Sequence, residues 1–221
     1  MSTSRLSSTQ VAILEALAGF EPRWTLTGGA ALAGFHLGHR TTRDLDLFWH
    51  GRDTLGDLAA EVTGALGATG FTVRGVRRTP AFARLHVESA DGGAVEVDLV
   101  ADPVPRVEAP DLVSIGGAEI EVDAKGEIFA NKLNALLSRS ELRDLIDVEA
   151  LMGAGLDLRA GLEAAALKDG AMSAATLAWV MSSLPVAALA QRERMPEATA
   201  TGLTRFRDEL CAELARLSAP G

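Results

Sequence analysis

The run Asp44-Leu45-Asp46-Leu47-Phe48 alternates acidic and apolar side chains with a period of two. Because successive side chains on a β-strand point to opposite faces, this pattern predicts a strand with the leucines in a core and both carboxylates side by side on the other face. Two carboxylates held so close repel one another, and removing them from water is costly unless a cation lies between them. A hard divalent ion such as Mg²⁺ is the natural partner, and a solvated strand face is the alternative.

The rest of the N-terminal half predicts a mixed α+β unit. Strand patterns cover residues 24–27, 44–49, 71–78, 81–89 and 94–100. Helical periodicity covers residues 8–18, 30–37 and 54–67. Asp91-Gly92-Gly93 joins the last two strands as a hairpin turn, and Asp53 or Thr54 is expected to cap the third helix.

The C-terminal half predicts helices. Residues 101–123 are rich in Pro, Gly and Val, which indicates short strands and loops and places the domain boundary there. Helical periodicity then covers residues 127–139, 141–152, 158–168, 173–184 and 199–217. We therefore expect an α+β lobe over residues 1–123 and a helical lobe over residues 124–221, an arrangement that suits a cleft between two lobes.

Composition excludes several classes of protein. The 221 residues are 48% apolar and 23% charged, which is typical of a folded globular chain rather than a disordered one. No stretch approaches the length of a membrane span, and Glu15 and Glu21 interrupt the N-terminal region too early for a secretory signal, so we expect a cytoplasmic protein. A single cysteine, Cys211, excludes a disulfide framework within one chain.

The net charge of −9 argues against a surface that binds polyanions throughout, because affinity for nucleic acid comes largely from Lys and Arg. The segment from Phe71 to His86 is an exception, since it holds four arginines and no acid. If a nucleic acid binds, we expect it to contact these arginines, which are Arg74, Arg77, Arg78 and Arg84.

Two further features accompany the acidic strand. Gly28-Gly29 separates a strand from a helix, where glycines let backbone N–H groups approach an anion such as a phosphate; a tight turn is the alternative. Asp98 lies in a later alternating strand, and a third carboxylate there could complete a two-metal site; a solvated polar face is again the alternative. The combined order resembles a polymerase-beta-like nucleotidyltransferase, which implies a mixed sheet with flanking helices and a helical C-terminal lobe.

The resemblance extends to a particular family. Residues 27–48, with the sequence TGGAALAGFHLGHRTTRDLDLF, are similar to the first motif of the AbiEii/AbiGii-type nucleotidyltransferases, the toxin components of abortive-infection and related toxin–antitoxin systems. The family's "HR, then Ser/Thr, then DxD" signature falls on His39-Arg40, Thr42 and residues 44–48.

A second block agrees with the same family. Lys132, Ala135 and Arg139 resemble its K-x-x-A-x-x-x-R helix, and residues 143–147 resemble its R-D-x-x-D motif, which contains Asp144 and Asp147. Lys132 and Arg139 share a helix face, which suits binding of a triphosphate; Arg139 could instead brace a carboxylate, and Asp144 could orient Lys132 or help to deprotonate the acceptor. A set of interhelical salt bridges is the alternative.

The resemblance implies Mg²⁺- or Mn²⁺-dependent transfer of a nucleoside monophosphate from an NTP (ATP, GTP, CTP or UTP) to an acceptor hydroxyl. It implies a toxin-like role, with tRNA as one acceptor in related families and a cognate antitoxin as partner. Asp44, Asp46 and Asp98 would hold metal, with Asp98 as general base, and Lys132 and Asp144 would complete the catalytic set. The residues expected to bind the nucleotide are Thr27, Gly28, Gly29, Arg40, Thr42, Lys132 and Arg139.

One departure concerns the glycine turn. The family often has Ser or Thr at or directly after the second glycine, where this chain has Ala30, so the hydroxyl contact must come from Thr27 or be replaced by backbone. Two other functions stay open: a nucleotidyltransferase acting on a small molecule of the aminoglycoside type, and a nucleotide-binding module without transfer activity. The last 70 or so residues are interpreted only as helices.

Overall fold

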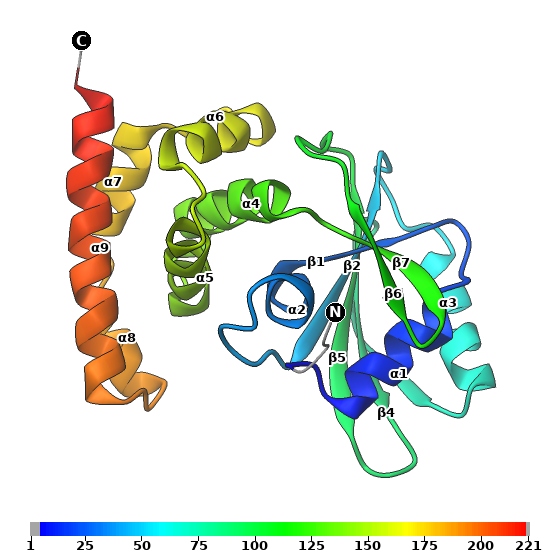
Figure 1. Cartoon of the computed structure of the whole chain (residues 1–221). Coiled ribbons are helices and arrows are strands. Elements are labelled where there is room, and N and C mark those ends of the chain that lie inside the picture. The colour runs from blue at the N-terminus through cyan, green and yellow to red at the C-terminus, as the bar shows by residue number, and fades with distance from the viewer. Residues whose placement is uncertain (1–4, 220–221) are drawn as a thin grey trace. The chain divides into compact units, whose positions relative to one another are not determined.

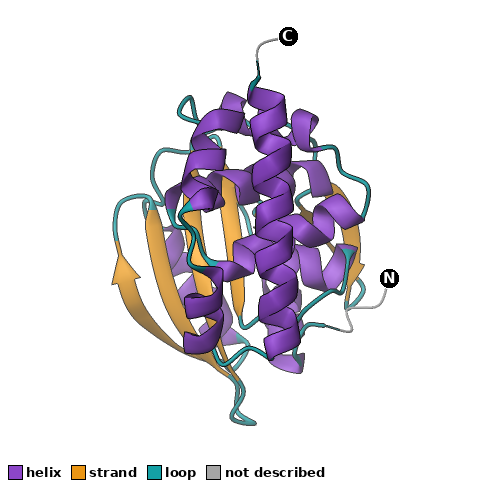
Figure 2. Ribbon diagram, turned by 90° about the vertical axis from the view of Figure 1, so that its left-hand side faces the viewer, coloured by secondary structure: helices purple, strands orange, loops and turns teal. Residues whose placement is uncertain are grey.

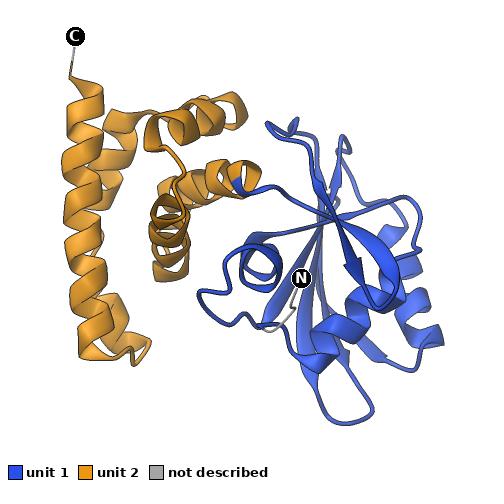
Figure 3. Cartoon of the chain, in the orientation of Figure 1, with its two compact units in different colours: residues 1–125 blue, residues 126–221 orange. Residues whose placement is uncertain are grey.

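The computed structural model describes residues 5–219. It divides into two compact units, Met1–Lys125 and Gly126–Gly221, which Figure 3 shows in different colours. The first unit contains both strands and helices, and the second is helical.

Within the described residues, the first unit is built on one seven-stranded sheet, drawn in orange in Figure 2. Its strands are β1 (Thr25–Thr27), β2 (Asp44–His50), β3 (Thr72–Arg78), β4 (Phe82–Glu88), β5 (Ala94–Asp102), β6 (Asp111–Ile115) and β7 (Ala118–Val122). Their order across the sheet is β3-β4-β5-β2-β1-β7-β6, with β2 parallel to β5 and β1 parallel to β7. The expected α+β class with a mixed sheet is confirmed.

The helices of this unit are α1 (Ser8–Leu17), α2 (Gly28–Ala31), the π-helical turn η1 (Leu32–His36) and α3 (Leu58–Ala68). A capping box fixes the start of α1, since Ser7 and Gln10 exchange backbone and side-chain hydrogen bonds. The third helix was expected from Thr54 with Asp53 or Thr54 as its cap, and this is wrong. The backbone N–H of Leu55 donates to the carbonyl of Pro80, so the chain stays in a turn until Leu58.

The core of the first unit lies on the apolar face of the sheet. The β2 side chains alternate: Leu45, Leu47 and Trp49 are buried, whereas Asp44 and Asp46 are half-buried. Helices α1 and α3 contact one another and pack along the sheet (Figure 1). The opposite face carries Asp44, Asp46 and Asp98 and is called the carboxylate face below.

The second unit consists of helices α4 (Lys125–Ser138), α5 (Leu142–Gly153), α6 (Leu158–Lys168), α7 (Ala174–Ser182), α8 (Val186–Arg192) and α9 (Glu197–Ser218). Gly161 lets α6 approach α4 closely, because a Cβ there would overlap the ring of Phe129. The sequence interpretation missed α8, a short helix that follows Pro185.

Among the described residues, no single helix is both long and apolar enough to cross a membrane. Helices α7 and α8, which meet at 60°, would pass such a test as a bent pair on length and composition alone.

Candidate active site

Sheet register brings the three predicted carboxylates together. In the parallel pair of β2 and β5, Asp46 is the partner of Asp98 and Asp44 is the partner of Glu96. Neighbouring strands lie about 4.8 Å apart, so paired residues project side by side from the same face. Asp98 is 7% exposed, and the β2 carboxylates are half-buried. The carboxylate face therefore concentrates negative charge at one place on the sheet.

Thr42 positions the first of these carboxylates. Its hydroxyl donates a hydrogen bond to Asp44 Oδ1 over 2.8 Å. The amide of Gln10 donates to the backbone carbonyl of Asp44 over 3.3 Å, which ties the start of β2 to α1. Thr42 of the motif therefore contacts the Asp44 carboxylate and orients that carboxylate.

Gly28 brings the glycine turn against the second carboxylate. It has a φ of +66°, which favours glycine, and a Cβ at this position would overlap Asp46 Oδ2. Thr27, its neighbour, is the register partner of Asp46 on β1, and its side chain makes no capping bond to α2. The turn and the Asp46 carboxylate are therefore in direct contact.

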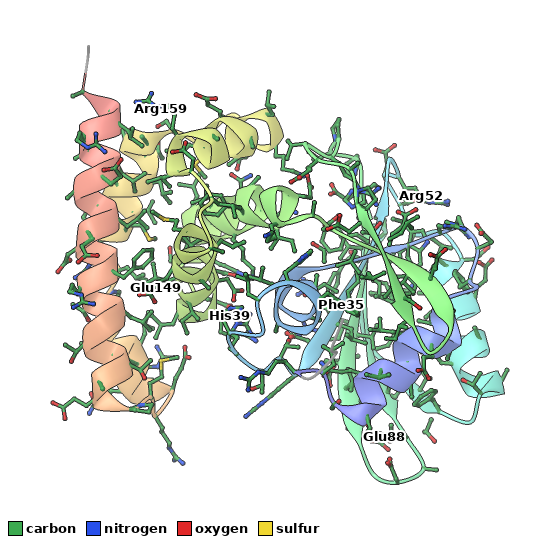
Figure 4. The ribbon with its side chains drawn as sticks, viewed as in Figure 1. Phe35, His39, Arg52, Glu88, Glu149 and Arg159 are labelled. Carbon is green, nitrogen blue, oxygen red and sulfur yellow. The ribbon has the colours of Figure 1, made fainter. Side chains whose placement is uncertain are left out.

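The Arg40 side chain packs against the same glycine turn. A Cβ at Gly29 would come within 2.6 Å of Arg40 Nη2, so the guanidinium packs against the glycine backbone. Arg40 follows His39 in the loop between η1 and β2, and His39 is labelled in Figure 4. The HR pair thus supplies a cation to the turn where a phosphate is predicted.

Arg84 pairs with the third carboxylate. Its Nε donates to Asp98 Oδ1 over 2.7 Å and its Nη2 to Asp98 Oδ2 over 2.6 Å, a bidentate pair. The hydrogen bonds to Asp98, together with the nearby charges of Asp98, Glu96 and Asp44, raise the pKa of Arg84 above its ordinary value against the effect of burial. Arg84 is therefore a permanent cation among the acids. The hairpin turn could have predicted this pair, because it sets Arg84 opposite Asp98.

A β-bulge arranges the other predicted arginines. The pairing of β3 with β4 shifts between Gly75 and Arg77, so Arg74 faces His86 and Arg77 faces Arg84. Without the bulge, residues three apart would point to opposite faces. Arg74 and Arg77 therefore both lie on the carboxylate face. Arg78 lies on the other face, where its Nη2 donates to the carbonyl of Gly56 over 2.8 Å.

In the second unit, Lys132 forms a buried ionic cluster. Its Nζ lies 2.8 Å from Asp144 Oδ1 and 2.8 Å from Asp147 Oδ2, and both carboxylates are fully buried. Arg139 closes the cluster with Nε 2.7 Å from Asp144 Oδ2 and Nη2 2.9 Å from Asp144 Oδ1. Asp144 thus orients Lys132, and Arg139 braces Asp144.

The cluster keeps Lys132 and Asp144 charged. Burial alone raises the pKa of Asp144, but the hydrogen bond from Arg139 and the charge of Lys132 bring it below its ordinary value. Burial alone lowers the pKa of Lys132, but the charges of Asp147 and Asp144 raise it above its ordinary value. An ammonium held in this way is fixed and permanently charged, which suits contact with a phosphate as well as packing of α4 on α5.

The sequence interpretation missed a further polar group on the first unit. His50, at the end of β2, has Nδ1 3.3 Å from Asp102 Oδ2 and Nε2 3.8 Å from Asp123 Oδ1. Arg106 Nε also approaches Asp123 Oδ1, at 3.7 Å. The β2 alternation extends to His50 and would have placed it on the face of the acids, but Asp123 and Arg106 are distant in sequence.

The donor set of the carboxylate face fits a hard divalent cation in its chemistry, since carboxylate oxygens are the ligands that Mg²⁺ and Mn²⁺ prefer. Asp44 and Asp46 are neighbours on one strand face, and Asp98 is in register with Asp46. Both Asp98 oxygens contact Arg84, and within residues 5–219 no three acidic, histidine or cysteine side chains are grouped around a single metal position.

The mixed sheet, the glycine turn against an acidic strand and the third carboxylate on the neighbouring strand define the class of nucleotidyltransferase folds. A model of the nucleotidyl transferase AbiEii toxin family, of type IV toxin–antitoxin systems, matches residues 12–215. The chain therefore belongs to the AbiEii family and is a nucleotidyltransferase of the toxin class. This confirms the family resemblance inferred from the motifs.

Solved structures share the fold. The nucleotidyltransferase toxin MenT4 of Mycobacterium tuberculosis H37Rv is 22% identical with a TM-score of 0.61, over 74% of this chain and 63% of that chain. JHP933 from Helicobacter pylori is 20% identical with a TM-score of 0.55, over 96% of both chains. An antigenic nucleotidyltransferase-like protein from Paracoccidioides brasiliensis is 16% identical with a TM-score of 0.52, over 90% of this chain and 98% of that chain. A comparison with curated proteins finds no match.

Proposed function

We propose that this toxin-family enzyme transfers a nucleoside monophosphate from an NTP to a hydroxyl of tRNA with the help of Mg²⁺ or Mn²⁺. The observation that carries the proposal is the position of Asp46. It contacts the glycine turn at Gly28 on one side and is in register with Asp98 on the other. One carboxylate thus lies between a place for the donor phosphates and a place for the acceptor.

The glycine turn is the place where the NTP, which donates the nucleotide, would bind. Gly28 and Gly29 would accept the triphosphate close to the backbone, and Arg40, packed on Gly29, would add a positive charge. The Thr27 hydroxyl would replace the one that Ala30 lacks. Lys132 is the further phosphate-binding cation of the proposal, with Arg139 and Asp144 holding its cluster in shape.

The metal would be held by Asp44 and Asp46, because both oxygens of Asp98 already contact Arg84. When bound, such an ion neutralises the triphosphate and polarises the phosphorus that is attacked. Asp98 would accept the proton of the acceptor hydroxyl while the new O–P bond forms, the bond between the α-phosphorus and its bridging oxygen breaks, and pyrophosphate leaves. Thr42 keeps Asp44 oriented throughout.

The acceptor side is the β5-β4-β3 half of the sheet. Arg84 lies on β4 beside the carboxylates, and Arg77 and Arg74 lie on the same face of β3, the edge strand. A phosphate-bearing acceptor such as tRNA would be attracted there, whereas a cationic drug of the aminoglycoside type would be repelled. We leave Arg78 out of the acceptor surface, because its side chain is on the opposite face.

The biological setting belongs to the same proposal. Membership of a type IV toxin family supports a cognate antitoxin as partner and the cytoplasm as the place of action.

The test is incubation of the full chain with each α-³²P-labelled NTP, Mg²⁺ and either total tRNA or an aminoglycoside panel. We expect label in tRNA that is absent with Asp46→Ala. Label only on a small molecule would replace tRNA as the acceptor. NTP binding without any incorporation would favour the binding-module alternative and overturn the proposal.

A further inference from the structure

We propose that Arg84 is a positioning residue for the transfer, which holds the Asp98 carboxylate with two of its N–H groups and offers the others to a phosphate of the acceptor. The inference rests on the proposed function and adds a residue that the sequence motifs do not contain. It starts from the bidentate contact of Arg84 with Asp98.

The Arg84 guanidinium has N–H groups that do not bond to Asp98. It carries five N–H groups in a planar fork, and the two bonds to Asp98 use two of them. The Arg84 side chain is 42% exposed, whereas that of Asp98 is 10% exposed. Arg84 is therefore on the solvent side of the pair, where its remaining donors can meet a ligand, and Asp98 is on the protein side.

The neighbours of Arg84 favour an anion there. The Phe82 ring is close to two guanidinium groups, with Arg77 Cζ 5.8 Å and Arg84 Cζ 6.0 Å from its centroid. Charge within the Arg84–Asp98 pair cancels, so Arg77 leaves this part of the face positive. An arginine fork suits bidentate binding of a phosphate, and an aromatic ring beside it suits a nucleobase.

Acidic side chains also face Arg84, and they limit how far the positive region extends toward β2. Glu96 and Asp44 both act on its charge. Glu96 is itself bonded to His86, with its Oε1 2.6 Å from Nδ1. The site is therefore positive toward Phe82 and Arg77 and negative toward β2, which would orient an acceptor with its phosphate on the arginines and its hydroxyl toward Asp98.

This geometry couples binding of the acceptor to the orientation of Asp98. A phosphate bound to Arg84 is one guanidinium away from the carboxylate proposed as general base, so binding the acceptor and aligning Asp98 become a single event. An acceptor without a phosphate next to its hydroxyl would bind more weakly and would not align Asp98. Loss of Arg84 should therefore raise the KM for the acceptor and also lower kcat, without weakening NTP binding.

The test uses a fluorescein-labelled RNA tetranucleotide and a matched probe whose last phosphodiester is an uncharged methylphosphonate. For the wild-type chain we expect about tenfold weaker binding of the neutral probe, as for loss of one charge-assisted contact. For Arg84→Gln we expect both probes to bind equally weakly. Arg84→Lys should restore the preference for the charged probe but leave kcat low, since lysine cannot hold Asp98 with two bonds.

Arg78→Gln is the matched control, because it removes an arginine of the same hairpin from the other face. It should leave the probe preference and the transfer kinetics unchanged. The inference is overturned if the wild-type chain binds both probes equally, or if Arg84→Gln keeps the preference and the wild-type kcat. If the wild-type chain transfers nothing to any acceptor, the proposed function fails, whereas the probe preference still decides whether Arg84 binds phosphate.

Discussion

Two ionic groups of the molecule look alike in composition and differ in burial. The carboxylate face of the first unit has Asp44 and Asp46 half-buried and Arg84 42% exposed in its side chain. In the second unit, Asp144 and Asp147 are fully buried and the Lys132 side chain is 9% exposed. Both contain aspartates in contact with basic groups, but the side chains of the first are partly open to solvent and those of the second are almost completely buried.

The difference separates activity from stability. Partly exposed charges are screened by water and contribute little to folding, whereas a buried charge that loses its partner is strongly destabilising. Substitutions of the half-buried Asp44 and Asp46 should therefore remove activity from a chain that still folds. Substitutions in the Lys132 cluster should cost stability as well.

The largest effect is expected from Asp46→Asn. Losing one metal-binding carboxylate should lower kcat by about 10³-fold or more, because several kcal/mol of transition-state stabilisation disappear. The melting temperature should stay the same or rise slightly, since repulsion with Asp44 is relieved. Initial rates and thermal melts measure both. A variant that unfolds would show instead that Asp46 is structural.

Asp144→Asn should lower stability as well as activity. Removing a buried carboxylate that pairs with Lys132 and Arg139 should cost about 3–5 kcal/mol of unfolding free energy, measured by urea denaturation at pH 7. Because the pKa of Asp144 is below its ordinary value, its contribution is complete at neutral pH and is lost as the pH falls below about 4.

The exposed acid Glu141 supplies the control for that measurement. Its carboxylate, 43% exposed, contacts Arg139 and Arg143 at longer distances. Glu141→Gln should change the unfolding free energy by less than about 1 kcal/mol. Equal losses for the two variants would contradict the contrast drawn between buried and exposed charges.

Gly28→Ala should affect activity more than stability. A positive φ at a non-glycine residue costs about 1 kcal/mol, and the new Cβ would in addition displace the Asp46 carboxylate. Gly51 has a φ of +73°, and a Cβ added there would meet no heavy atom within 4 Å, so Gly51→Ala carries the strain alone. We expect similar melting temperatures for the two variants, and a loss of transfer rate for Gly28→Ala only.

The smallest effect concerns His86 at the rim of the carboxylate face. Hydrogen bonds with Glu96 and then Glu88 raise its pKa above the ordinary value of 6.5. The protonated pair should therefore stabilise the fold fully below about pH 6.5, and this contribution should fade as the pH rises through the raised pKa. An NMR titration of the imidazole checks it. In Glu96→Gln the pKa should return toward 6.5, and an unchanged pKa would exclude Glu96 as the cause.

Local patterns in the sequence predicted much of this site. The alternation of β2 predicted which side chains share the carboxylate face, and the glycine pair predicted a turn beside them. What the sequence did not predict depends on contacts between distant segments or on irregular backbone. Arg40 reaches Gly29 from the loop that precedes β2. His50 on β2 lies near Asp123, which follows β7. The bulge that turns Arg77 toward Arg84 has no signature in the pattern of apolar and polar residues.

Transfer of a nucleoside monophosphate at the carboxylate face can be tested by the fate of two labelled phosphorus atoms. The chain is incubated with tRNA and an NTP labelled with ³²P either at the α or at the γ phosphorus. We expect the α label to enter the acceptor, the γ label to be recovered in pyrophosphate in equal amount, and Asp46→Asn to abolish both. Entry of the γ label into the acceptor, release of orthophosphate, or undiminished transfer by Asp46→Asn would contradict it.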